Sequence, residues 1–163
     1  MVMLVHIAPE SRLAAIRRGG ILAPRRRGRP GGVFAVPVTR NFFVSHQWLR
    51  ELRRGKPGSF VGIYFRLPDE ERVFAGHYFK DHAWSTAAEA VGRFLAAEDK
   101  LGWQIVIPRK ILPSEIHRCR RLPQVVGWRY YPGAHGKAPC SCDYCSRGQY
   151  GGARFRKRMD IRD

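Results

Sequence analysis

MVMLVHIAPESRLAAIRRGGI, residues 1–21, is the stretch from which the fold of this 163-residue chain is predicted. Its apolar run Val2–Val5 has the length of a buried strand and is too short to span a membrane. His6 stands at the end of this run, and Pro9 suits the first turn of a helix, where its missing N–H needs no partner. The Gly-Gly pair at 19–20 predicts the end of that helix. The stretch therefore predicts a strand that closes on a histidine and leads into a helix.

Later segments predict further strands and helices. A strand at 32–39 leads into a helix at 42–54, whose first turn Asn41 caps. Two strands, Phe60–Leu67 and Arg72–Phe79, are expected to form a hairpin because a short acidic turn joins them. Thr86 and Glu89 have the spacing of a capping box, which predicts a helix over 87–98. The last two predicted strands are Trp103–Pro108 and Gln124–Tyr131.

Length and composition bound the class of protein. A chain of 163 residues with 44% hydrophobic residues suits one core-forming domain. No run is long enough for a transmembrane helix, and the first residues lack the pattern of a signal peptide. We therefore expect a soluble cytoplasmic protein with no membrane partner.

The charge balance predicts a polyanionic partner. The chain carries 30 Lys and Arg against 13 Asp and Glu, a net charge of +17, which favours nucleic acid, RNA or DNA. A generally basic surface and an anionic membrane surface are the alternatives. Aromatic residues interleave with the arginines near the C-terminus, which suits stacking on single-stranded bases. The candidate nucleic-acid-binding residues are Arg25, Arg26, Arg27, Arg147, Arg154 and Arg156.

Three local signatures occur in a fixed order over residues 2–116. They are the strand that closes on His6, the Gly32–Phe34 strand that leads into a helix, and the turn Leu112–Ile116 after the strand that contains Gln104. Together they resemble the ADP-ribosyltransferase superfamily, which includes the RNA 2′-phosphotransferases. The resemblance implies an α+β fold over residues 1–132, with a split mixed or antiparallel sheet and flanking helices.

The resemblance also implies a cofactor and a site. The cofactor would be NAD, with His6 on its ribose and with Phe34 and Phe42 or Phe43 beside the nicotinamide. The family's catalytic glutamate corresponds to Gln104, so that His6 and Gln104 form the implied catalytic pair. A glutamine carries no charge to stabilise a developing oxocarbenium ion, whereas the 2′-phosphotransferase branch works without that glutamate.

The segment 133–163 lies outside the resemblance. Three of the four cysteines fall there as C-x-C-x-x-C, which favours a structural zinc site in a chain without a secretion signal. Reduced structural or redox thiols are the alternative. The predicted ligands are His135, Cys140, Cys142 and Cys145. Cys119 and His117 are alternatives to His135 as the fourth ligand.

These features lead to one function and two alternatives. The first expectation is an NAD-dependent ADP-ribosyltransferase-like enzyme that acts on nucleic acid. The alternatives are an NAD-dependent RNA 2′-phosphotransferase and a non-catalytic, zinc-containing nucleic-acid-binding module.

Overall fold

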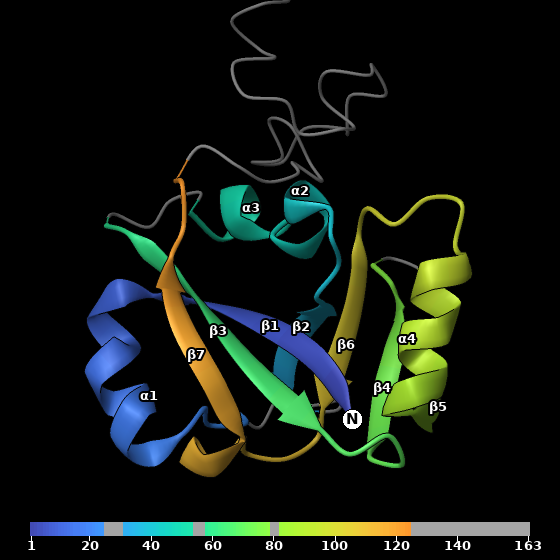
Figure 1. The fold of residues 1–163 in the computed structure, drawn as a ribbon, viewed down its shortest axis with the longest axis horizontal. Helices are drawn as coiled ribbons and strands as arrows, with labels where there is room; N and C mark the ends of the chain where they lie inside the picture. Colours follow the sequence, from blue (N-terminus) through green and yellow to red (C-terminus); the bar gives the residue numbers. More distant parts are fainter. Residues whose placement is uncertain (25–30, 54–57, 79–81, 125–163) are drawn as a thin grey trace, which may run out of the picture.

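The computed structural model describes residues 1–24, 31–53, 58–78 and 82–124, and within them seven strands form one antiparallel sheet. The strands are β1 (Val2–Pro9), β2 (Val33–Pro37), β3 (Phe60–Leu67), β4 (Arg72–His77), β5 (Ala83–Thr86), β6 (Trp103–Ile107) and β7 (Ile116–Arg121). The helices are α1 (Leu13–Gly19), α2 (Phe42–Ser45), α3 (Leu49–Arg53) and α4 (Ala87–Ala96), with 3-10 turns at Glu10–Arg12 and Pro113–Glu115. The predicted α+β class is confirmed, and the sheet order is β5-β4-β6-β2-β1-β3-β7 (Figure 1).

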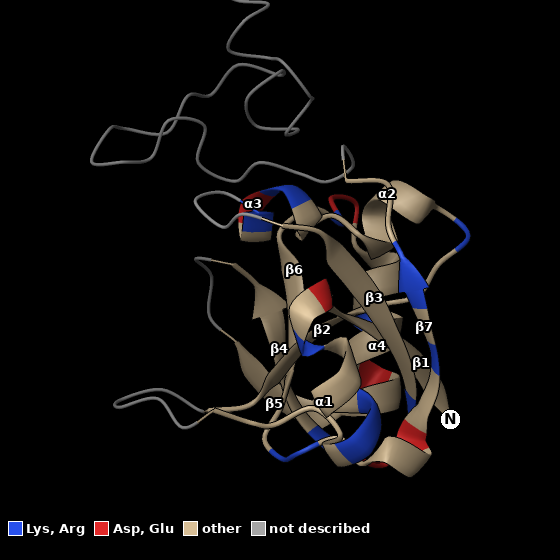
Figure 2. Ribbon diagram, turned by 90° about the vertical axis from the view of Figure 1, so that its left-hand side faces the viewer, with Lys and Arg blue, Asp and Glu red and all other residues tan. Residues whose placement is uncertain are grey.

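The sheet opens between β1 and β2. All eight residues of β1 pair with β3, whereas only Leu4 and Val5 pair with β2. Beyond this short contact the two strands diverge. Figure 2 shows β1, β3 and β7 on one side of the molecule and β6, β4 and β5 on the other, with α1 and α4 between them.

The main hydrophobic core lies between these two halves of the sheet. Its members come from both halves and from α1 and α4. Each large side chain removed from water there stabilises the fold by roughly 1.5–3 kcal/mol. The largest fully buried members are Leu4, Ile63, Phe65, Leu67, Ile105, Ile107 and Ile111. A smaller cluster of Ile7, Leu49, Phe60 and Leu122 lies under α3.

The opening strand is longer than the sequence indicated. It continues through His6 to Pro9, so that His6 lies inside β1 and not at its end. Pro9 is the last strand residue and does not occupy the first turn of the helix. The reason is tertiary, because β3 offers partners as far as Phe60, which pairs with Pro9.

The second predicted helix is broken into two. Asn41 caps α2 as expected, since its side chain accepts hydrogen bonds from the amides of Phe43 and Val44 at 3.0 and 3.2 Å. The chain then leaves the helical path at residues 46–48, where the buried His46 and Gln47 bind other elements. Phe43, in the first turn of α2, is 65% exposed.

The predicted hairpin of β3 and β4 is wrong, although both strands exist. β3 pairs with β1 and β7, and β4 pairs with β5 and β6. The acidic turn Pro68–Glu71 therefore carries the chain from one half of the sheet to the other. Both strands are mostly apolar, so the short turn between them does not by itself decide their partners.

The capping box predicted at Thr86 is confirmed. Its side chain accepts the amide of Glu89 at 3.2 Å, and the Glu89 carboxylate accepts the amide of Thr86 at 2.9 Å. The helix it starts, α4, faces the core with Ala90 and Phe94, while Leu95 is 54% exposed.

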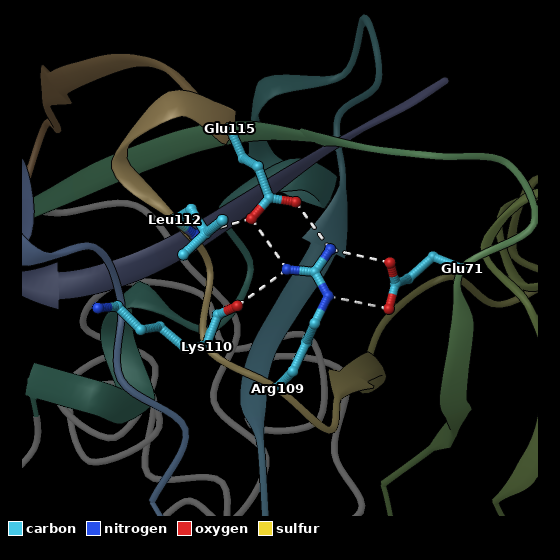
Figure 3. Close-up of polar contacts among 5 residues, drawn as sticks. All are labelled: Glu71, Arg109, Lys110, Leu112 and Glu115. Carbon is cyan, nitrogen blue, oxygen red and sulfur yellow. Dashed lines mark hydrogen bonds and ion pairs between the residues drawn. The ribbon is translucent and has the colours of Figure 1, made fainter.

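A double ion pair fixes the turn between β6 and β7 (Figure 3). Arg109 donates hydrogen bonds to both carboxylate oxygens of Glu71 and to both of Glu115, at 2.7–3.0 Å. Glu115 also accepts the amide of Leu112 at 2.7 Å, at the start of the 3-10 turn Pro113–Glu115. The hydrogen bonds from Arg109 hold the pKa of Glu115 below its usual value.

Two of the sequence-based predictions concern the C-terminal part of the chain. The predicted strand Gln124–Tyr131 falls, beyond Gln124, outside the described residues, as does the segment 133–163. β7 is the last described strand and was not predicted, because its sequence, IHRCRR, shows little apolar alternation. In the described part of the chain, no helix is long and apolar enough to cross a membrane.

Candidate functional site

His6 lies where the sheet opens. The amide of Val38 donates to the carbonyl of Met3 at 3.0 Å, and the Leu4 and Val5 pairs follow. Beyond these pairs, the contact between the two strands is a hydrogen bond from the His6 side chain. Its Nδ1 lies 2.7 Å from the carbonyl oxygen of Phe34 on β2. An imidazole nitrogen therefore binds a carbonyl that a backbone amide of β1 would bind in a continuous ladder.

The protonation state of His6 follows from this contact. A carbonyl oxygen only accepts, so Nδ1 carries a proton. Burial lowers the pKa of His6, and the hydrogen bond to Phe34 opposes that effect only in part. The ring is therefore neutral near pH 7, and Nε2 is an acceptor. No described residue hydrogen-bonds to Nε2.

The predicted catalytic partners do not meet. On β1, side chains two residues apart lie on the same face of the strand. His6 therefore shares a face with Leu4 and Ala8, which face the main core. In β6, the core-facing set is Ile105 and Ile107, so Gln104 points to the opposite side of the sheet. The β6 residue on the side of His6 is Trp103, whose indole Nε1 is buried without a hydrogen-bond partner among the described residues.

Gln104 belongs instead to an aromatic patch on β4, β5 and β6. Its side-chain nitrogen lies 2.9 Å from Nε2 of His82, and the His82 ring stacks on Phe74 with centroids 5.2 Å apart. Phe74 also contacts Trp84, which is directly opposite on β5 and is 47% exposed. His82, which no sequence motif marked as a site residue, is thus the residue that contacts Gln104.

The predicted nicotinamide-binding aromatics are also separated. Phe34 reaches His6 through its backbone carbonyl, while its side chain alternates to the opposite face from His6. The Phe42 ring is covered by His46, with centroids 4.0 Å apart. Phe43 touches Phe42 edge-on and is otherwise exposed.

His46 is the second buried histidine with a defined role. Its Nδ1 donates to the carbonyl of Phe42, and its Nε2 lies 2.7 Å from the hydroxyl of Tyr64. Burial is the main cause of its lowered pKa, and nearby Arg120 adds to the effect. Burial also raises the pKa of Tyr64. The neutral imidazole thus accepts a hydrogen bond from the Tyr64 hydroxyl, which ties the end of α2 to β3.

The lowered pKa values of His6 and His46 predict that the fold loses stability in acid. A lowered folded-state pKa means that the unfolded chain binds more protons below about pH 6.5, the ordinary histidine value. The contribution of these histidines to the free energy of unfolding is therefore fully present above this pH. It is lost as the pH falls from there through their folded-state pKa values. We expect urea unfolding at pH 7.5 and 5.5 to show a decrease of at most about 1.4 kcal/mol per pH unit for each histidine.

The matched variants for that measurement are His46→Gln and His117→Gln. His46→Gln should flatten the pH dependence, whereas His117→Gln, an exposed change on β7, should leave it as in the parent chain. An equal dependence in all three proteins would contradict this assignment.

The remaining predicted site residues lie outside the described part of the chain. They are Arg25, Arg26, Arg27, His135, Cys140, Cys142, Cys145, Arg147, Arg154 and Arg156. Of the alternative zinc ligands, Cys119 is partly buried against the main core and His117 is exposed on β7. Within the described residues, no three metal-ligating side chains gather in one place.

Comparison with known proteins adds no relative. No protein-family model, curated protein or solved structure matches this chain.

Proposed function

We propose that this chain is an NAD-dependent ADP-ribosyltransferase-like enzyme that acts on nucleic acid, with His6 as its cofactor-binding residue. The observation that carries the proposal is the opening of the sheet between β1 and β2 with the His6 ring set in it. The resemblance of residues 2–116 to that superfamily implies a split sheet and a histidine on the first strand. The antiparallel sheet that opens at His6 supports both features.

The chemistry of His6 fits a dinucleotide. The Phe34 carbonyl orients the ring and selects the tautomer with the proton on Nδ1. Nε2 then accepts a hydrogen bond, and a ribose hydroxyl is a suitable donor. When bound, NAD supplies an activated ADP-ribosyl group with nicotinamide as the leaving group. Gln104 faces away from His6 and is given no part in cofactor binding.

The first test is a thermal-shift titration with NAD. A ligand that binds only the folded state stabilises it by about 2.7 kcal/mol at about 100 times its dissociation constant, which raises the melting temperature by several degrees. His6→Ala should abolish this shift. His6→Gln keeps a donor for the Phe34 carbonyl and covers the case in which His6→Ala folds poorly. Gln104→Ala is the matched control and should keep the full shift.

Transfer is then measured with NAD labelled in the ADP-ribose part. RNA, DNA and protein pools are offered, and label is expected on nucleic acid with the parent chain and not with the His6 variants. An unchanged NAD shift in both His6 variants, or no shift in the parent chain, would refute the proposal.

One observation favours a second enzymatic function. Gln104, at the position of the family's catalytic glutamate, faces away from His6, and the RNA 2′-phosphotransferase branch does not require that glutamate. A 2′-phosphorylated RNA incubated with NAD distinguishes the two reactions, because only this branch removes the phosphate. If NAD produces no thermal shift at all, the non-catalytic nucleic-acid-binding module is the remaining interpretation.

A further inference from the structure

Three arginines gather on the outer face of β3 and β7. Arg118 pairs with Tyr64 across the two strands and Arg120 pairs with Gly62. Arg66 follows two residues after Tyr64 on β3, so alternation places all three arginines on one face. All three are exposed. We call Arg66, Arg118 and Arg120 the β7 arginine cluster, and Figure 2 shows the basic stretch of β7 along one side of the molecule.

No carboxylate compensates these charges in the described structure. The neighbouring Arg121 pairs with Glu10 at 2.8 Å, and Arg109 pairs with Glu71 and Glu115. Among the described residues, none of the cluster forms an ion pair. Like charges on adjacent strand positions repel one another and lower stability. An external polyanion would remove that repulsion.

One member of the cluster, Arg118, is also held in place. The guanidinium of Arg118 lies 4.7 Å from the centre of the Tyr64 ring, a cation–π distance. Tyr64 is itself 2% exposed, and its hydroxyl contacts His46. Arg118 and Arg120 are two residues apart on one strand, which separates their backbones by roughly 6.6 Å along it. The fixed guanidinium group of Arg118 loses less entropy on binding than a free side chain does.

We propose that the β7 arginine cluster binds the phosphate backbone of nucleic acid without reading its sequence. Guanidinium groups match phosphate oxygens in geometry and charge. A membrane surface is disfavoured because interfacial binding needs exposed apolar side chains, and no large exposed apolar side chain among the described residues lies on β3 or β7. The chain continues from β7 toward the basic residues of 147–158. The inference deepens the proposed function by naming a surface for its target.

The test uses the full chain and the double variant Arg118→Gln with Arg120→Gln. Fluorescence anisotropy with labelled single-stranded RNA, single-stranded DNA and duplex DNA is measured between about 50 and 200 mM salt. Removal of two phosphate contacts should weaken binding to at least one of these by about tenfold and reduce the salt slope by about 2. The same variant should melt within a few degrees of the parent chain, because the relief of repulsion offsets the lost contact between Arg118 and Tyr64.

The matched control is Arg17→Gln with Arg18→Gln on α1. It removes the same two charges, from +17 to +15 (17 − 2 = 15), at exposed positions outside the cluster. Its binding and salt slope should stay close to those of the parent chain. Equal losses in both double variants, or no loss in the Arg118/Arg120 variant, would overturn the proposal. The proposal would also be overturned if the Arg118/Arg120 variant lost binding to anionic vesicles but kept its binding to nucleic acid.

These outcomes are independent of the cofactor. A chain that binds NAD through His6 but keeps its nucleic-acid affinity in the Arg118/Arg120 variant refutes this inference alone. A chain that shows no NAD shift but loses nucleic-acid binding in that variant refutes only the proposed enzymatic activity.

Discussion

Gly20→Ala is expected to lower the free energy of unfolding by about 3 kcal/mol or more. Gly20 ends α1 with φ at 79°, a left-handed conformation that a side chain disfavours. A Cβ at this position would also stand 2.0 Å from the carbonyl oxygen of Ile111. That carbonyl accepts the amide of Ile21 at 2.9 Å, and Ile111 donates back at 3.0 Å, so neither side has room to retreat. Urea denaturation measures the loss.

Gly19→Ala is the matched control one residue earlier. Gly19 is the last residue of α1, and nothing lies within 4 Å of the position its Cβ would take. Alanine there should be neutral or should stabilise the protein by roughly 0.5–1 kcal/mol, because it restricts the unfolded chain more than glycine does. A similar loss from both substitutions would mean that helix termination, and not the close approach to Ile111, governs this site.

Gln47→Leu is expected to cost about 3 kcal/mol, although the two side chains are similar in size. Gln47 is fully buried. Its amide nitrogen donates to the carbonyls of Val44 and Lys100 at 3.0 and 2.9 Å, and its oxygen accepts the amide of Gly102 at 2.5 Å. Leucine would leave three backbone groups without these partners in a place with little access to water. The variant should melt several degrees lower.

Leu52→Gln makes the reverse exchange in the neighbouring helix. Leu52 is 36% exposed, so its substitution should change stability by no more than about 0.5 kcal/mol. If Gln47→Leu were equally mild, the buried amide would not be what joins the segment between α2 and α3 to the start of β6.

Local signals explain the parts of the fold that the sequence predicted well. The Thr86–Glu89 box, the Asn41 cap and the end of α1 at Gly20 each depend on residues within about one helical turn of one another. Such contacts form wherever the segment lies, so their residue types specify them. The edge strands β5 and β7 were missed because their exposed positions carry polar or aromatic side chains that blur the alternation.

The placement of the candidate site was not predictable in the same way. A one-residue shift in the register of β6 would place Gln104, and not Trp103, on the side of His6. The sequence WQIVI is apolar at three consecutive positions, so the neighbouring strands decide which residues face the core. His82 reaches Gln104 only because β4 and β6 are paired.

By itself, the sequence determined an α+β protein with a strongly positive charge, the ends of two helices and the residue types near its opening strand. Only the tertiary structure decided that β3 and β4 pair with different strands and that β1 continues past His6. It also decided that β1 and β2 stop pairing at the position of the His6 ring. Helix ends depend on contacts a few residues apart. Strand partners depend on long-range packing, which the periodicity of one segment does not encode.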